Sequence, residues 1–541
     1  MSSPEARSRF QRALPLSLGL VAFVFALVFP MDRAFSDTSI LYERVQANAA
    51  PYYNVAYLPL AELFAKVFGS SLGLERALTT FSALCIGGGV ALTARLARRL
   101  GLGTLAIATS SLLLAAAPAT LFFGGVIEVH GLQFLGAILA INIAWSARST
   151  RGQEAWLRLG IAALLALVTH LSHLLLLPGL VLLAWRQGTG QAGDQEQASP
   201  DNIRVTTGCY FGRRGLPFLV IFLVAGTIAT VSLIGTGYDT WSKWPSLQWL
   251  STLILFGRMF LDGLLERGFY SLDESGLYLV HELLFPLGLV TAGFLCGIMA
   301  LRSRLNGSEP VLRIFAARAL VATIPALVIL PQGGVLERGG YFMSMAPLLA
   351  LLIAVALHTA WSAARTQSRR SLLLASCTAL VAIQANLALS ARSDFRAAAP
   401  DARVWAMEVA QQLRPGDKIF VSDLARNLAL TMATEGVYVR DLKRDLDLVP
   451  RRLRSNTAKR RLVERLQDKA FPGDLWLDKA LLPGLRLGDL TQADTTWPED
   501  WRNTLLRLIK LYPDLPLNLV ETPSGFSLIK IQFRPDASTK L

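Results

Sequence analysis

The chain has 541 residues, of which 52% are hydrophobic and only 17% are charged. Apolar runs of about 18 residues or more recur along it, and a helix of that length spans a bilayer. This composition excludes an ordinary soluble protein. In a membrane protein the positions of the charged residues indicate the topology, so the formal net charge of +14 is not interpreted as a sign of nucleic-acid binding. The four cysteines show neither a disulfide framework nor a zinc spacing.

The apolar runs predict an all-α polytopic membrane bundle with eleven crossings. Gly, Ser and Thr interrupt most of the runs, which suits helices in close contact and argues against a β-barrel. Residues 156–187 are interpreted as two short segments, because Pro178 and the polar sequence "THLSH" interrupt them. The predicted spans are 13–30, 76–94, 102–123, 129–147, 156–170, 172–187, 215–236, 278–301, 312–331, 341–363 and 371–390.

Arginines gather before the first span and in alternate loops, and the positive-inside rule places these segments in the cytoplasm. The N-terminus is then cytoplasmic, its first apolar run is an uncleaved anchor, and the odd number of crossings puts residues 391–541 outside. The long outer loops 31–75 and 237–277 contain amphipathic, aromatic-bearing pieces that suit helices in the membrane interface. The Arg-rich, Lys-poor membrane half favours a bacterial inner (plasma) membrane.

The composition changes after about residue 390, where most of the lysines occur. The short apolar runs "DKIFVSD", "EGVYVRD", "GDLWLD" and "FSLIKIQF" alternate there with helix-like stretches. The sequence therefore predicts two domains: a multi-spanning domain over 1–390 and an extracytoplasmic soluble α/β domain over 391–541.

The stretch "SDTSILYERVQ" in the first outer loop places Asp37 at the start of a predicted helix. Helix capping alone could account for this residue, because a helix N-terminus favours negative charge. A carboxylate at the outer membrane face is equally a candidate catalytic base.

Glu128 lies beside His130 at the outer end of an apolar span. Acidic groups at membrane depth generally face a bundle interior or cavity, which marks Glu128 as a candidate functional residue. His170 and His173 share a helix face by spacing. Two alternatives remain open: pairing of Glu128 for packing alone, and a divalent metal site made by Glu128 with the three histidines. No HExxH motif is present, and hydrogen bonding within a polar pocket is favoured for the histidines.

The sequence "PQGGVLERGGYFMSMAP" brings Arg338 and Tyr341 to the outer entrance of a late span. Glycines beside them allow the backbone to approach a ligand. The planar guanidinium of arginine binds phosphate oxygens in a bidentate manner, so Arg338 is a candidate phosphate contact. The alternative is an interfacial arginine or a pair with Glu337.

No Walker-type GxxxxGK[ST] sequence and no GxGxxG after a strand occurs on the predicted cytoplasmic side. A nucleotide-activated substrate is therefore not expected. A donor carried by a membrane lipid phosphate would supply external chemistry, which points to lipid-linked sugar transfer.

Four motifs occur in an order that resembles the order found in the GT-C glycosyltransferases, especially in their protein O-mannosyltransferase-like and RgtA/B-like branches. These motifs are the acidic first loop, "IEVHGLQF", "THLSHLLLLPGL" and "ERGGYFMSMAPLLALL". The resemblance covers most of residues 13–390. It implies that Asp37 is the first-loop catalytic acid, Glu128 the second-loop acid and Arg338 a donor-phosphate contact. The predicted substrate-binding residues are then Arg338, His130, His170, His173, Tyr341 and Tyr42.

The resemblance implies an inverting glycosyltransferase that moves a sugar from a polyprenyl-phosphate donor to a protein, lipid or glycan acceptor on the outer membrane face. No cofactor is firmly implied, and a divalent metal is the one candidate. Two other classes remain open. One is a non-catalytic carrier or flippase of a lipid-linked sugar, and the other is a scaffold whose 391–541 domain binds a partner.

Overall fold

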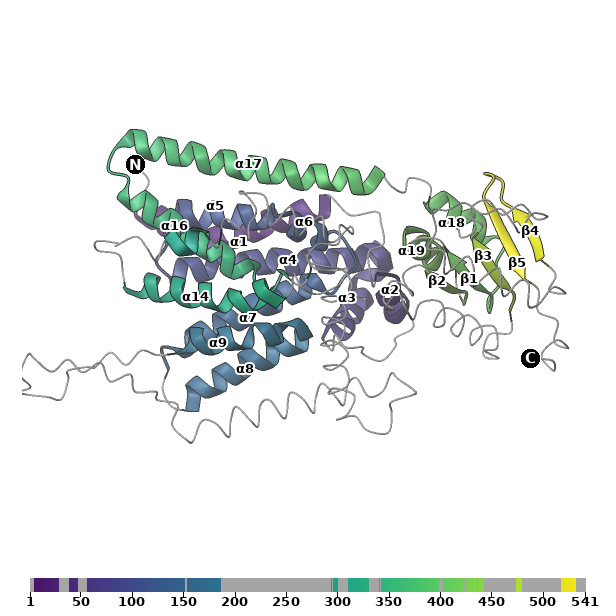
Figure 1. The fold of residues 1–541 in the computed structure, drawn as a ribbon, viewed down its shortest axis with the longest axis horizontal. Helices are drawn as coiled ribbons and strands as arrows, with labels where there is room; N and C mark the ends of the chain where they lie inside the picture. Colours follow the sequence, from purple (N-terminus) through teal and green to yellow (C-terminus); the bar gives the residue numbers. More distant parts are fainter. Residues whose placement is uncertain are drawn as a thin grey trace, which may run out of the picture. The chain divides into compact units, whose positions relative to one another are not determined.

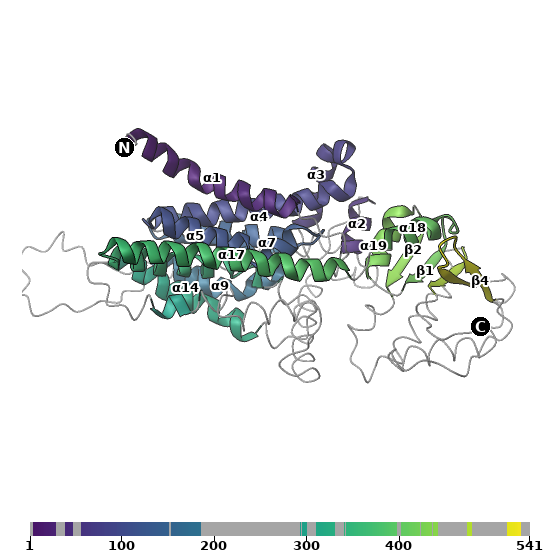
Figure 2. The same ribbon diagram turned by 90° about the horizontal axis from the view of Figure 1, so that it is seen from above.

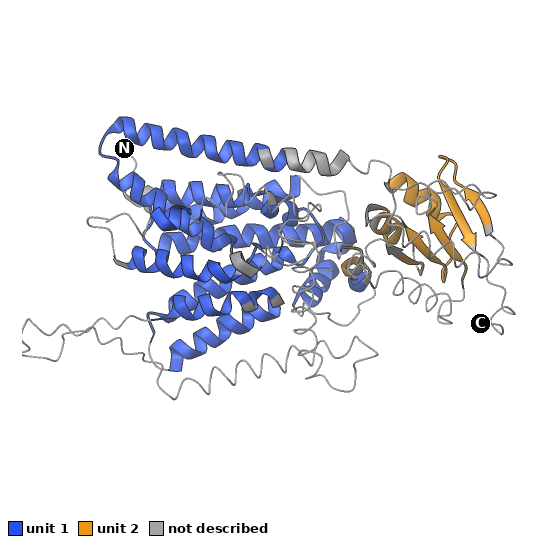
Figure 3. Ribbon diagram, in the orientation of Figure 1, with its two compact units in different colours: residues 1–30, 44–391 blue, residues 31–43, 392–541 orange. Residues whose placement is uncertain are grey.

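The structure is a computed structural model that describes residues 4–28, 38–46, 56–150, 153–185, 293, 295–299, 310–329, 340, 342–397, 402–421, 424–434, 436–441, 473–478 and 517–531. The chain divides into two compact units (Figure 3). The helical unit comprises residues 1–30 and 44–391, and the sheet unit comprises residues 31–43 and 392–541. Helix α2 (Thr38–Gln46) crosses the boundary between them.

The helical unit is built from long apolar helices and shorter connecting ones (Figures 1 and 2). They are α1 (Pro4–Val28), α3 (Tyr57–Leu72), α4 (Leu74–Arg99), α5 (Thr104–Ala115), α6 (Pro118–Gly124), α7 (His130–Ala147), α8 (Gln153–Thr169), η1 (Leu171–Leu175), α9 (Leu177–Ala184), α14 (Pro310–Ile329), α16 (Ala346–Ala363) and α17 (Gln367–Ala397).

Helix α4 is central to this packing, because it contacts α1, α3 and α7, and α7 in turn packs on α8. Small residues allow the backbones of α1 and α4 to approach closely. A Cβ built on Gly19 would lie 2.6 Å from the carbonyl oxygen of Gly87, so a side chain at position 19 would clash with α4. Close approach through small residues is typical of membrane helices.

Four described helices are long and apolar enough to cross a membrane, namely Gln11–Val28, Leu74–Arg99, His130–Ala147 and Ala346–Ala363. Helix α1 exposes large apolar side chains, with Leu16 74% and Val28 63% exposed, as a lipid-facing helix would. The predicted span 215–236 lies outside the described residues, and so does most of 278–301. The count of eleven crossings stays a prediction.

The chain breaks within two of the predicted regions. The predicted span 102–123 is not one continuous helix, because α5 ends at Ala115 and α6 begins at Pro118. Proline lacks an N–H and disfavours helical backbone in the residue before it, and Ala117 is accordingly extended (φ −62°, ψ 135°). The predicted break in 156–187 is confirmed, since η1 separates α8 from α9.

The sheet unit contains a five-stranded mixed sheet in the order β2-β1-β3-β5-β4. Strand β1 is parallel to β2 and β3, and β5 is antiparallel to β3 and β4. Four strands coincide with the four predicted apolar runs, and β4 was not predicted. The elements are α18 (Ala402–Ala410), β1 (Lys418–Val421), α19 (Leu424–Ala433), β2 (Tyr438–Asp441), β3 (Leu475–Asp478), β4 (Leu517–Glu521) and β5 (Ser527–Ile531).

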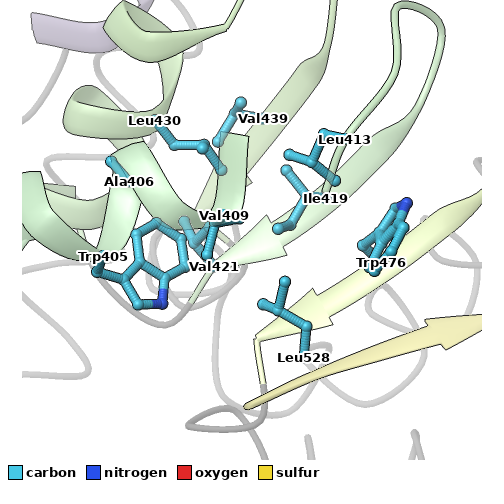
Figure 4. Close-up of a cluster of buried hydrophobic side chains, with 10 residues drawn as sticks. All are labelled: Trp405, Ala406, Val409, Leu413, Ile419, Val421, Leu430, Val439, Trp476 and Leu528. Atoms are coloured by element: carbon cyan, nitrogen blue, oxygen red, sulfur yellow. The ribbon is translucent and has the colours of Figure 1, made fainter. Parts of the chain in front are cut away.

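The core of the sheet unit lies where the two helices cover the sheet. Trp405 and Val409 of α18 meet Leu430 of α19, together with Ile419 and Trp476 of the strands (Figure 4). The register pairs Ile419 with both Val439 and Trp476. Side chains from two helices and four neighbouring strands therefore share one apolar cluster.

Candidate functional site

Glu128 lies in the loop that joins α6 to α7 and has no solvent exposure. Its Oε2 accepts a hydrogen bond of 3.3 Å from the backbone N–H of Val129. Helix α7 begins two residues later, at His130, and a helix N-terminus stabilises a nearby negative charge. The start of α7 thus stabilises the charge of the Glu128 carboxylate, which burial would otherwise disfavour.

A chain of hydrogen bonds joins His130 to His170. His130 Nδ1 lies 2.6 Å from Gln133 Oε1, one turn along α7. Gln133 Nε2 donates to Ser172 Oγ at 2.9 Å, and Ser172 Oγ lies 2.8 Å from His170 Nδ1. All four side chains are buried, and the two imidazole centroids are 5.5 Å apart. Helix α7 and the break after α8 therefore meet in one polar cluster.

His173 belongs to the same cluster but has a different set of partners. Its Nδ1 lies 2.6 Å from the carbonyl oxygen of Ala166 and 3.3 Å from Thr169 Oγ1. Since a carbonyl only accepts, Nδ1 of His173 carries a proton. The ring lies 6.3 Å from that of His170. His173 thereby hydrogen-bonds to the last turn of α8.

The histidines and Glu128 do not form a metal centre in the described part of the chain. No group of three or more His, Cys, Asp or Glu side chains among the described residues has an arrangement that could hold a metal ion. The Nδ1 atoms of His130, His170 and His173 all make hydrogen bonds within the cluster. Hydrogen bonding in a polar pocket is the arrangement observed.

Two neighbours define the surroundings of His130. The ring of Phe123 packs edge-on against it with centroids 4.5 Å apart. On the other side, a Cβ built on Gly340 would overlap the His130 ring at Nε2. Only a glycine fits there, and this contact brings Gly340 to the start of α7.

Tyr57, at the beginning of α3, is a site residue that was not predicted from the sequence. Its side chain has no solvent exposure, and its ring meets Phe81 of α4 at 5.8 Å. Burial raises the pKa of the Tyr57 phenol far above its ordinary value, and the Glu128 carboxylate raises it further. Tyr57 therefore remains a protonated hydrogen-bond donor near Glu128. The sequence feature that could have identified Tyr57 is its position as a tyrosine, with a polar hydroxyl, at the start of an amphipathic helix.

Asp37, Arg338 and Tyr341 lie outside the described residues. Tyr42 lies on α2, where its side chain is buried. The structure thus joins the three histidines to Gln133 and Ser172, and it places Glu128 two residues before His130 and near Tyr57.

No protein-family model matches the chain, and no curated protein matches it. Solved structures do match. The structure of ArnT from Cupriavidus metallidurans bound to undecaprenyl phosphate superposes with a TM-score of 0.56 at 15% identity, covering 95% of this chain and 97% of that one. The apo structure of the same ArnT gives a TM-score of 0.52 at 15% identity, covering 97% and 98%. Along nearly its whole length, this chain has the fold of the ArnT structures.

Proposed function

We propose that this chain is a membrane glycosyltransferase that transfers a sugar from a polyprenyl-phosphate donor to an acceptor hydroxyl on the outer membrane face, with inversion. The observation that carries the proposal is a fully buried carboxylate, Glu128, two residues before the buried His130 at the start of an apolar helix. Ionisable groups inside membrane bundles are costly and are retained for function. The likeness to an ArnT structure that holds undecaprenyl phosphate supports a lipid-linked donor.

The contact between Gly340 and His130 supports a role for Arg338 in this site. Arg338 precedes Gly340 by two residues, and two residues of chain reach at most about 7 Å. In the proposed reaction, Arg338 binds the donor phosphate with its planar fork and stabilises the charge that develops on it. Tyr341, directly after Gly340, contacts the sugar.

Asp37 is the proposed base, and it directly precedes α2. Its carboxylate takes the proton of the acceptor hydroxyl, whose oxygen forms the new bond to the anomeric carbon. The bond between that carbon and the phosphate oxygen breaks, and the electron pair leaves with the polyprenyl phosphate. Tyr42 of α2 faces the substrate in this proposal, while Glu128 and the histidines position the acceptor.

The proposed orientation puts the N-terminus in the cytoplasm of a bacterial cell and the sheet unit outside its inner membrane. Helix α4 supports this arrangement, because Arg95, Arg98 and Arg99 lie near its C-terminal end, whereas only Arg76 lies near its N-terminal end. The excess of arginines fits a span whose C-terminal end is cytoplasmic.

The function is tested by incubating purified protein in lipid with labelled polyprenyl-phosphate sugars, polyprenyl-phosphate mannose first, and candidate acceptors. We expect a new glycoside of inverted configuration. Movement of the labelled lipid between leaflets without a new glycoside would instead identify a carrier.

We expect Asp37→Asn to lower the transfer rate by about 10² to 10⁴, the usual contribution of a positioned base. Asp32→Asn is the matched control in the same loop and should retain activity, because Asp32 adjoins Arg33 and pairs with it in our interpretation. Equal rates for wild type and Asp37→Asn, in correctly inserted protein, would refute the assignment of the base.

A further inference from the structure

A pair of arginines lies at the end of the helical unit opposite His130. Helix α7 begins at His130 and ends at Ala147, and its 18 residues extend about 27 Å. Arg148 directly follows α7 and is half-buried. Arg318 lies on α14 and is also half-buried. These arginines are therefore remote from the histidine cluster, and their role is separate from that of the histidines.

Aromatic side chains hold the two arginines together. The Cζ atom of Arg148 lies 4.1 Å from the centre of the Trp145 ring, which is a cation–π contact. Trp145 in turn meets Phe315 of α14 edge-on, with ring centroids 5.0 Å apart. Arg318 follows Phe315 by three residues, a spacing that places both on one face of α14. The charge of Arg148 acts on Arg318, so the two guanidinium groups lie within electrostatic range of each other.

The described residues offer these two cations few acceptors. Arg318 Nη1 donates a hydrogen bond to the carbonyl oxygen of Trp185, directly after α9. The Nε of Arg148 is buried and has no hydrogen-bond partner among the described residues. Glu154, an acid near this end of the bundle, pairs with Arg158 at 2.6 Å. Within the described part of the chain, no carboxylate forms an ion pair with Arg148 or Arg318.

This arrangement favours the binding of an anion. Two like charges in an apolar bundle repel each other, and an N–H removed from water without an acceptor costs further free energy. An anion between the two guanidinium groups offsets both costs. The planar fork of arginine matches the oxygens of a phosphate and remains charged at any working pH. A phosphate is therefore the anion that these side chains suit best.

The surroundings indicate a phosphate carried by a membrane lipid. Val311 and Val321 lie seven residues before and three residues after Arg318, so they share its face of α14. They are 41% and 47% exposed, as side chains that contact lipid tails would be. Trp145 and Trp185 lie at the same end of the bundle, and tryptophans gather where helices meet lipid headgroups. Apolar side chains thus adjoin the charged pair.

We propose that Arg148 and Arg318 bind the phosphate group of an anionic phospholipid, at the end of the helical unit opposite the histidines. The phosphate oxygens accept hydrogen bonds from both guanidinium groups, and the lipid tails pack along Val311 and Val321. In the proposed orientation this end is cytoplasmic, where basic pockets between membrane helices bind anionic headgroups. The site does not depend on the proposed glycosyl transfer.

Native mass spectrometry of the full chain in detergent tests the site, because it resolves bound lipids and gives an apparent Kd for each. The probes are phosphatidylglycerol, which has a net negative charge, and phosphatidylcholine, which has the same phosphate but no net charge. We expect wild type to bind phosphatidylglycerol at least about tenfold more tightly, since the choline cation competes with the arginines. Equal affinities would overturn the proposal without recourse to any variant.

Three variants locate the binding. We expect Arg148→Gln and Arg318→Gln each to weaken phosphatidylglycerol binding about tenfold, because each removes a charge-assisted hydrogen bond. Arg148→Lys keeps the charge but loses the fork, so it should bind more weakly than wild type and more tightly than Arg148→Gln. Arg313→Gln is the matched control, because it removes an exposed charge from the same helix and should leave the affinity unchanged. Equal weakening by Arg313→Gln would indicate general charge attraction and overturn the site.

Inorganic phosphate distinguishes a lipid from a free anion. We expect millimolar inorganic phosphate to leave bound phosphatidylglycerol in place, because it lacks tails to pack on α14. Displacement of the lipid at equal concentrations would identify a site for soluble phosphate and overturn the assignment to a lipid. Binding is measured without a sugar donor. A protein that transfers no sugar but selects the anionic lipid through Arg148 and Arg318 would refute the proposed function and support this site.

Discussion

Glu128 and Tyr57 illustrate how this bundle holds a charge away from water. The carboxylate has no solvent exposure, and the phenol beside it stays protonated because burial and the carboxylate both raise its pKa. The N-terminus of α7 stabilises the negative charge of Glu128. Such an arrangement can hold an acceptor hydroxyl in place for attack.

We expect Glu128→Gln to preserve folding, because the amide has the same shape, and to lower the transfer rate by at least about tenfold through loss of the charge. The initial rate of glycoside formation measures the effect. Glu154→Gln is the control, since Glu154 makes only an exposed pair with Arg158 at 2.6 Å on α8. Equal rates for both variants would rule out a role for the charge of Glu128.

At the scale of single elements, the long apolar helices could be predicted, and so could the break after α8, because polar residues and Pro178 interrupt an apolar run. The break at Ala117 was missed because Pro118 lies within a largely apolar run. Strand β4 was missed because it is short and Pro516, a residue that is rare in strands, directly precedes it.

The hydrogen-bond chain of the site could not be predicted in the same way. Gln133 and Ser172 are separated by 39 residues, and each resembles an ordinary polar residue on a packed helix. Periodicity places a residue on a face but does not identify its partner. The histidines were noticed because they are rare, whereas the residues that orient them were not.

Helix packing in the bundle can be tested with two glycines. A Cβ on Gly89 of α4 would overlap the buried ring of Phe134 on α7, whereas a Cβ on Gly69 of α3 meets nothing within 4 Å. We expect Gly89→Ala to destabilise the helical unit by about 1–3 kcal/mol. Gly69→Ala should stabilise it by about 0.5–1 kcal/mol through reduced backbone entropy of the unfolded chain. Thermal unfolding in detergent measures both, and equal shifts would contradict the packing.

Helix α18 is tied to the turn between β4 and β5 by Glu408, which accepts bonds from the hydroxyl and the backbone N–H of Ser524, the latter at 3.0 Å. These bonds and one from Thr522 lower the pKa of Glu408. A folded pKa below the unfolded value, about 4.3, stabilises the fold above that pH. The stabilisation is lost as the pH falls through the folded pKa.

We therefore expect the unfolding midpoint of the sheet unit to decrease below about pH 4, and Glu408→Gln to make this decrease smaller. The measurement is thermal unfolding over a pH series. Glu521→Gln, at an exposed position on β4, is the control. An identical pH dependence in wild type and Glu408→Gln would contradict the interpretation.

At the scale of the whole molecule, each unit has a core of its own. The helical unit packs α4 against α1, α3 and α7, and the sheet unit packs α18 and α19 on its sheet. Units with separate cores can unfold separately. The sheet unit also has its own polar anchor, Asp417, which is 3% exposed.

Asp417 accepts bonds from the backbone N–H groups of Arg414 and Asp474 and from Trp476 Nε1, at 2.9, 2.8 and 3.0 Å. We expect Asp417→Asn to place an amide NH₂ against donors and leave at least one unsatisfied, which costs about 1–3 kcal/mol. If the units unfold separately, calorimetry of the full chain shows two transitions. Asp417→Asn should lower only that of the sheet unit, and Gly89→Ala only that of the helical unit. A single transition that both variants lower equally would show that the two cores unfold together.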